Sequence, residues 1–240
     1  MMHEKHKEIF RHRAQFWAED RNIVWLLSAL TCYTFILYPL VSILGSRLAI
    51  QIIQDLFFLV VLLSGLFALT HHKFTRMIFT GIIVIVISIH LIRFASGANF
   101  LLGLDIAVSM LTVIAFVIFL LMYVFKEGPV TWHRIQGAVA AYLLIAIAFS
   151  IGYNLIFFLI PGAFKFPDEV PDIGDPGIVN IFYYFSVTTV TTMGYGDITP
   201  VHPMARTLAM IEAYLGHLFP TITLARLVSL HIVHSSRGDK

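Results

Sequence analysis

Charged residues are scarce in this sequence, and cysteine is almost absent. Only 12% of the 240 residues are charged, against roughly 25% in an average soluble domain, and 58% are hydrophobic. This composition excludes an ordinary soluble fold and indicates an integral membrane protein. The single cysteine, Cys32, excludes a disulfide framework or a thiolate metal cluster within one chain. The formal net charge of +2 is too small to indicate a nucleic-acid partner.

Motifs that carry enzymatic chemistry are also missing. The sequence contains no nucleophile elbow, no phosphate-binding loop and no HExxH metal motif. The adjacent His71 and His72 form an isolated pair. We therefore expect no catalytic residues, no enzymatic activity and no cofactor.

Long apolar runs divide the chain into predicted membrane spans. Five of them are long enough to cross a hydrocarbon core of roughly 30 Å as helices. They lie at about residues 23–44, 48–70, 75–95, 100–125 and within 135–164. A sixth span, residues 203–233, has weaker hydropathy because polar side chains interrupt it, namely Glu212, His217, Arg226 and His231. The sequence thus predicts an all-α membrane protein with six transmembrane helices.

The positions of the basic residues predict the orientation of these spans. An even number of spans places both termini on one side. Basic residues gather in the N-terminal segment and in the loops after the second and fourth spans, which carry Lys73, Arg76, Lys126 and Arg134. Because cytoplasmic loops carry the excess of lysine and arginine, we expect a multi-pass protein of the cell membrane with both termini in the cytoplasm.

One segment is helical in character but too short to cross the bilayer. After a loop rich in proline, glycine and acidic residues at 161–177, residues 178–191 are aromatic and β-branched. A helix of this length measures about 21 Å. Irregular backbone at membrane depth is tolerated only where it is buried in protein or lines a wet cavity. The pattern predicts a re-entrant helix that ends inside the membrane.

The residues that follow this helix carry the most specific motif of the chain. Residues 191–197 read TTMGYGD, which closely matches the TVGYG filter of potassium channels. A potassium ion that sheds its water needs carbonyl and hydroxyl oxygens in exchange, and Thr192 adds a hydroxyl. Gly194 and Gly196 permit the backbone angles that turn successive carbonyls inward. The motif predicts a selectivity filter.

On these features, the segment from about residue 134 to 233 resembles the pore domain of the potassium channel superfamily. The four preceding spans match the six-transmembrane type with one pore loop per subunit, and the compact chain is typical of prokaryotic members. The resemblance implies a homotetramer around a cyclic axis, with K⁺ as the permeant ion. It places Asp197 at the outer edge of the filter. The implied filter residues are Thr192, Met193, Gly194, Tyr195 and Gly196.

The predicted organisation has five parts. They are a cytoplasmic N-terminal segment (1–22), a four-helix transmembrane domain (23–125), a cytoplasmic linker (126–134), a pore domain (135–233) and a short cytoplasmic tail (234–240). Within the pore domain, an outer helix precedes the pore helix (178–191), the filter (192–196) and the inner helix (203–233).

Residues around the filter are expected to support it. Tyr184 and Phe185 stand where many family members carry aromatic residues that brace the filter tyrosine, and Thr188 and Thr191 lie next to the filter. Met193 replaces the valine or isoleucine that is usual in the family. We expect this change to alter the stability of the filter more than its selectivity.

The sequence also suggests how the pore opens. The fourth span contains no arginine or lysine, so we expect no strong voltage dependence. In the sixth span, Pro220 cannot donate a hydrogen bond to the carbonyl of Gly216, which predicts a gating hinge or, alternatively, a static bend.

Four charged residues are candidates for structural or regulatory roles. Glu212 is expected to brace the pore helix from behind, and Arg93 is expected to pair with Asp105 across the turn between the third and fourth spans. Arg226 approaches the cytoplasmic boundary, where its side chain either snorkels or contacts anionic lipid head groups.

These features predict a potassium-selective channel that conducts passively. Two alternatives remain open. A modulatory, non-conducting channel subunit would share the same fold. A subunit of a potassium uptake transporter is the other, although carriers usually show internal repeats and this chain has a single filter motif.

Overall fold

The apolar runs of the sequence fold into helices. The computed structural model describes residues 23–37, 40, 47–69, 73–96, 99–126, 130–167, 172, 173, 175 and 177–238. The predicted N-terminal segment 1–22, the end of the first span and parts of the loops and of the tail lie outside these residues. The first helix covers Ile23–Ile36, and its C-terminal part overlaps the π-helical turn η1 (Tyr33–Leu37).

Six further helices follow within the described residues. They are α3 (Arg47–Leu69), α4 (Lys73–Ser96), α5 (Asn99–Val124), α6 (Trp132–Leu159), α7 (Gly177–Val190) and α8 (Pro203–Gly238). Their bounds follow the local sequence. After α6, Pro161 cannot continue a helix and Gly162 adopts a left-handed φ of 81°. Pro203 opens α8, where its missing amide costs nothing.

Three helices of the described chain are long and apolar enough to cross a membrane. They are Leu101–Val124, Trp132–Leu159 and Pro203–Ser229. The other apolar helical stretches are shorter, namely Ile23–Ile36, Ile50–Ser64, Phe79–Arg93 and Gly177–Val190. The structure is therefore that of a mainly α-helical membrane protein, and the pore helix predicted at 178–191 corresponds to α7.

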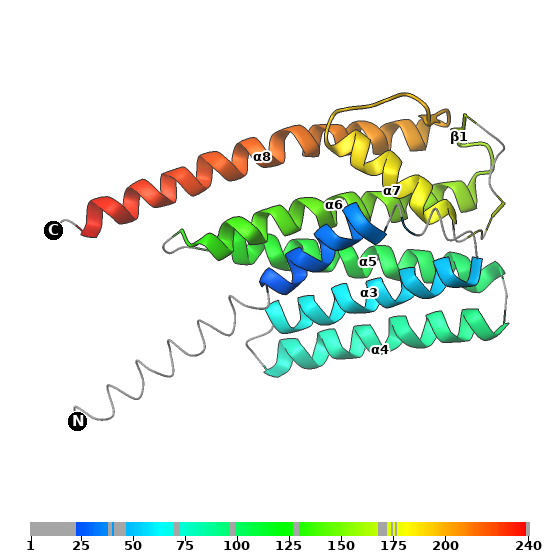
Figure 1. Cartoon of the computed structure of the whole chain (residues 1–240), viewed down its shortest axis with the longest axis horizontal. Helices are drawn as coiled ribbons and strands as arrows, with labels where there is room; N and C mark the ends of the chain where they lie inside the picture. The colour runs from blue at the N-terminus through cyan, green and yellow to red at the C-terminus, as the bar shows by residue number, and fades with distance from the viewer. Residues whose placement is uncertain are drawn as a thin grey trace.

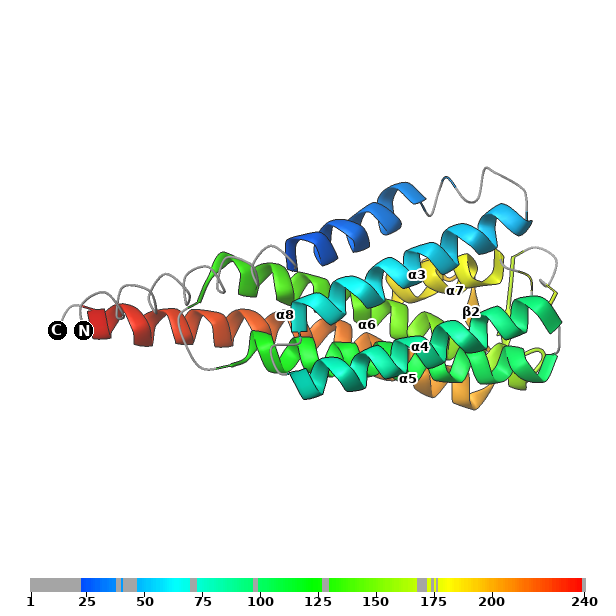
Figure 2. The same ribbon diagram turned by 90° about the horizontal axis from the view of Figure 1, so that it is seen from below.

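The helices form two groups on either side of α6. Helices α3, α4 and α5 lie side by side, and α6 packs against α5 (Figure 1 and Figure 2). Helices α7 and α8 lie on the other side of α6 and contact each other (Figure 1). The short helix α7 is thus held between the outer helix α6 and the inner helix α8.

Apolar and aromatic side chains fill the spaces between these helices. One core, around Leu26, Leu30, Val113 and Leu144, joins the first helix, α5 and α6. An aromatic core, with Tyr153, Phe157, Phe164, Phe182 and Phe185, lies between α6 and α7. A third core joins α3, α4 and α5 through Leu62, Phe79 and Phe116. The first two cores include side chains of α7 and fix this helix on its buried side.

The structure adds one feature to the predicted all-α fold. Strand β1 (Phe164–Lys165) pairs antiparallel with strand β2 (Thr199–Pro200), with Phe164 opposite Pro200. This two-residue pair ties the entry to α7 to the exit of the filter segment. Sequence patterns did not indicate it because two residues are too few to show an alternation.

Candidate selectivity filter and its supports

The chain enters and leaves the filter region at the same end of the molecule. Helix α7 runs inward from the end where β1 lies, and residues 191–198 return to that end before α8 begins (Figure 1). α7 has 14 residues, about two thirds of the length needed to span the bilayer. This is the re-entrant course expected of a pore helix.

The backbone of the returning segment alternates in handedness. Thr192, Gly194 and Gly196 have φ angles of 59°, 53° and 79°, whereas Met193 and Tyr195 between them lie outside the left-handed region. Alternation of this kind turns successive peptide groups to the same side, which lines up carbonyl oxygens. The glycines were expected in this conformation. Thr192 was not, and a non-glycine residue held there stores backbone strain of about 1–3 kcal/mol.

The last turn of α7 holds the inner end of the filter. The amides of Met193 and Gly194 donate to the carbonyl of Thr188 at 2.9 and 3.0 Å, and the amide of Thr192 donates to Thr189 at 2.9 Å. These contacts use amide groups rather than filter carbonyls. The segment after α7 is thereby anchored to the last turn of this helix through its amide groups.

The filter segment is exposed in the single chain. The two aromatic residues predicted to brace it, Tyr184 and Phe185, make different contacts. Residues 191–197 are exposed, with Met193 at 57% and Tyr195 at 65%. The ring of Tyr184 stacks on that of Tyr195, with centroids 6.3 Å apart and planes at 9°. Phe185 instead is buried, and its ring meets that of Tyr153 edge-on at 4.9 Å. Phe185 supports α7 from behind and does not lie against the filter tyrosine.

Glu212 is buried behind α7. Its carboxylate accepts hydrogen bonds from the hydroxyls of Tyr153 on α6 and Ser186 on α7, and Glu212 has an exposed fraction of 0%. The Ser186 hydroxyl also lies 2.7 Å from the carbonyl of Ala146 on α6. The inner, pore and outer helices therefore meet at one polar centre. Sequence reasoning placed Glu212 behind the pore helix but missed Ser186 and Tyr153.

The C-terminal end of α7 is held between α6 and α8. The hydroxyl of Tyr142 donates to the carbonyl of Val190 at 2.8 Å. Gly216 of α8 lies against the same residue, so that an added Cβ would come within 2.7 Å of the Val190 carbonyl carbon. Gly216 is therefore needed for the close packing of α8 against the end of α7, in addition to its predicted role as a hinge. α8 continues as one helix through Pro220.

Two further polar contacts fix α7 and were not found from the sequence. Gln54 of α3 donates to the side-chain oxygen of Asn180 at 3.1 Å, and the hydroxyls of Thr34 and Tyr183 lie 2.5 Å apart. The partners are more than 100 residues apart in sequence, so no local pattern could pair them.

The small polar residues near the filter bond to their own segment. The hydroxyl of Thr188 donates to Phe185 at 3.0 Å, and that of Thr191 donates to Val187 at 2.6 Å. Asp197 is exposed and accepts the amide of Ile198 at 3.0 Å. Asp197 thus lies at the exposed end of the filter segment.

The remaining predicted charged residues make contacts within the chain. Arg226 donates to the carbonyl of Phe125, just after α5, at 3.1 Å, and its guanidinium lies 5.2 Å from the centre of the Phe125 ring. This contact lies within the chain, whereas the sequence left open snorkelling or a contact with anionic lipid head groups. Arg93 Nε lies 2.9 Å from Asp105 Oδ2, which is the pair expected between the third and fourth spans.

A comparison with protein families matches this region directly. A family model described as "Ion channel" matches residues 176–232, which include α7, the filter and most of α8. The chain is similar to "Inward rectifier potassium channel Kirbac3.1" of Paramagnetospirillum magnetotacticum, with 44% identity over 50 residues, or 21% of this chain and 17% of that protein. The chain therefore matches less than a fifth of that relative's length. No solved structure matches the chain. These findings support a relation of the chain to the potassium channel superfamily, a group of membrane channels rather than enzymes.

Proposed function

We propose that this chain is a subunit of a potassium-selective channel that conducts ions passively through a homotetrameric pore in the cell membrane. The observation that carries the proposal is the alternating left-handed backbone at Thr192, Gly194 and Gly196, directly after a re-entrant helix. A ring of four such segments would offer K⁺ successive layers of carbonyl oxygens in place of water. Each subunit contributes Thr192, Met193, Gly194, Tyr195 and Gly196 to the filter.

The exposed surfaces of the chain support the tetramer. Side chains along α8 are exposed although apolar, including Tyr214 at 70% and Leu224 at 66%. The filter segment is exposed as well. A filter with open carbonyls is unfavourable in contact with lipid, so its exposed face must meet water, ions or other subunits. Fourfold assembly around the filter provides all three.

The gating part of the proposal rests on two features. α5 carries Asp105 but no arginine or lysine, so strong voltage dependence of the familiar kind is not expected. Opening instead involves the inner helix α8 near Gly216 and Pro220.

The test is potassium and sodium flux through the purified protein in liposomes, with barium as a blocker. Gly194→Ala should abolish selective flux because alanine resists the left-handed backbone at that position. Gly162→Ala is the matched control, since Gly162 is also left-handed and has free space around it but lies outside the filter. Alanine strains the backbone similarly at Gly162. We expect the Gly162→Ala variant to have the potassium selectivity of the unmodified chain.

The outcomes separate the alternatives. Selective flux that survives in Gly194→Ala would contradict the filter assignment. A stable tetramer that is inserted in the membrane but conducts under no condition would instead favour the modulatory subunit.

A further inference from the structure

A cavity of about 160 Å³ lies away from the filter, where α3, α4 and α5 meet α6 and α7. Its walls are largely apolar and aromatic, and they include Phe57, Ile147, Ile151 and Phe157. One end is polar, with Asp55, His90, Arg93, Asp105 and Ser109 on the lining. The cavity thus has an apolar body and a polar end, the combination found in sites for small molecules.

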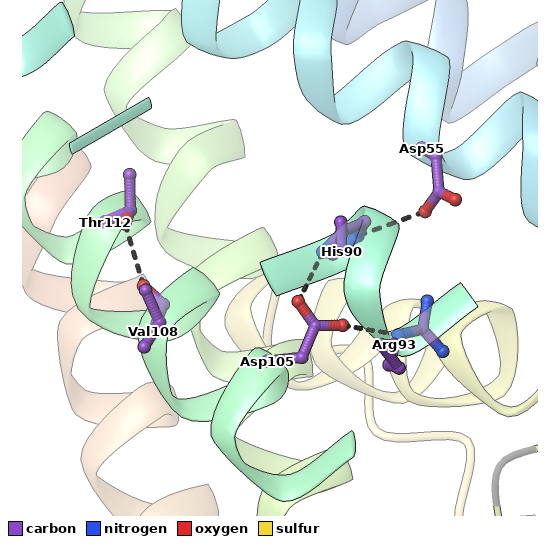
Figure 3. Close-up of polar contacts among 6 residues, drawn as sticks. All are labelled: Asp55, His90, Arg93, Asp105, Val108 and Thr112. Carbon is purple, nitrogen blue, oxygen red and sulfur yellow. Dashed lines mark hydrogen bonds and ion pairs between the residues drawn. The ribbon is translucent and has the colours of Figure 1, made fainter. Parts of the chain in front are cut away.

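The charges at the polar end balance one another. His90 Nε2 lies 3.1 Å from Asp55 Oδ1, and His90 Nδ1 contacts Asp105 Oδ1, so both ring nitrogens face carboxylates (Figure 3). Both contacts are hydrogen bonds only for the imidazolium form, because a neutral ring has a single N–H. Arg93 adds a second cation at Asp105 Oδ2 (Figure 3). Within this cluster two cations face two carboxylates, and the further carboxylate on the lining, Asp175, accepts the amide of Gly177 at 2.9 Å.

One hydroxyl at this end has no hydrogen-bond partner among the described residues. Ser109 lies one helical turn after Asp105 on α5 and is 7% exposed, and its hydroxyl makes no hydrogen bond within the described part of the chain. Buried hydroxyls in folded proteins are almost always paired. An occupant that reaches Ser109 with a hydroxyl of its own would satisfy it.

We propose that the cavity binds a small neutral amphiphile, a phenol or a compact alcohol whose hydroxyl pairs with Ser109 and whose apolar body lies among Phe57, Ile151 and Phe157. The size fits one aromatic ring, since an engineered apolar cavity of about 150 Å³ binds benzene. The charges of the cluster are already paired with one another, which favours a neutral ligand over an ammonium or a carboxylate. A neutral amphiphile also reaches a site within the membrane by partitioning into the lipid.

The experiment compares two probes by ¹⁹F NMR with the full chain in lipid nanodiscs. 4-Fluorophenol carries the hydroxyl, and fluorobenzene lacks it. Ser109→Ala removes the proposed partner. Thr112→Val is the matched control, because Thr112 is one turn further on α5 and its hydroxyl already donates to Val108 at 2.7 Å (Figure 3). Ile151→Trp fills the cavity.

We expect saturable binding of 4-fluorophenol to the unmodified chain and to Thr112→Val, about fivefold weaker binding to Ser109→Ala, and none to Ile151→Trp. Fluorobenzene should bind the unmodified chain and Ser109→Ala with similar affinity. Equal affinity of 4-fluorophenol for the unmodified chain and Ser109→Ala would overturn the proposal, as would binding no greater than to empty nanodiscs. The readout does not involve ion flux, so it is independent of the proposed channel activity.

Discussion

Alanine at Gly216 should disturb the filter because this residue touches the end of the pore helix. An added Cβ would lie 2.7 Å from the carbonyl carbon and 2.8 Å from the Cα of Val190, and even closer to its oxygen. Main-chain atoms cannot rotate away, so α7 or α8 must shift. The shift also strains the hydrogen bond that the Tyr142 hydroxyl donates to the Val190 carbonyl.

The size of the effect follows from three contributions. Overpacking costs about 1–3 kcal/mol, a lost hydrogen bond costs about 1 kcal/mol, and alanine gains about 1 kcal/mol over glycine in a helix. The expected result for Gly216→Ala is a loss of about 2 kcal/mol in the free energy of unfolding. Gly81→Ala in α4 is the control, because no atom lies within 4 Å of its added Cβ, and it should be neutral or stabilising.

The assay is unfolding of the purified protein by SDS titration, followed by flux measurements in liposomes. A hinge alone predicts changed opening with unchanged ion preference. The packing contact predicts lower stability and weaker potassium selectivity together. The packing argument fails if Gly216→Ala is as stable as Gly81→Ala and retains full selectivity.

Three further predictions concern buried or bridging polar groups. Glu212→Gln keeps an acceptor for Tyr153 and should stay within about 1 kcal/mol of the unmodified chain, whereas Glu212→Ala should lose about 2–4 kcal/mol in SDS unfolding. Equal stability of the two variants would contradict this. Arg226→Ala should loosen α8 from Phe125 and change the open fraction in single-channel recordings, while ion preference stays the same. An unchanged open fraction would count against it. Asp105→Asn removes the carboxylate charge that Arg93 and His90 share, although His90 keeps Asp55, and should lower unfolding stability by about 3 kcal/mol, whereas exposed Asp197→Asn should have little effect on unfolding. Similar stability of the two would refute the buried cluster.

Features that depend on local sequence were predictable. The apolar runs gave α3, α4 and α5 with bounds close to those observed, and the length of the segment after the acidic loop gave α7 as a short helix. The filter motif was recognisable because Gly194 and Gly196 are needed for its backbone. Thr192 in the same conformation was missed, since the intrinsic preference of threonine opposes it.

Features that depend on which way a helix faces were not predictable from hydropathy. Tyr184 and Phe185 were both expected to brace the filter, but neighbouring residues on a helix point about 100° apart. Only Tyr184 therefore lies against Tyr195, and Phe185 enters the aromatic core. Apolarity alone does not say how far each helix is rotated. For the same reason, the sequence did not predict the hydrogen bond from Tyr142 to Val190 or the contact of Arg226 with Phe125.

The single chain supports the candidate filter on one side, and the proposed assembly would support it on the other. Polar contacts from the first helix, α3, α6 and α8 fix α7 on its buried side within one subunit. On the opposite side, the filter residues Met193 and Tyr195 are exposed in the single chain. Because the filter backbone is strained at Thr192, it holds its shape only if both sides are restrained. Filter shape and proposed assembly are then linked, so a variant that weakens the buried side, such as Glu212→Ala, should lower the yield of tetramer together with stability.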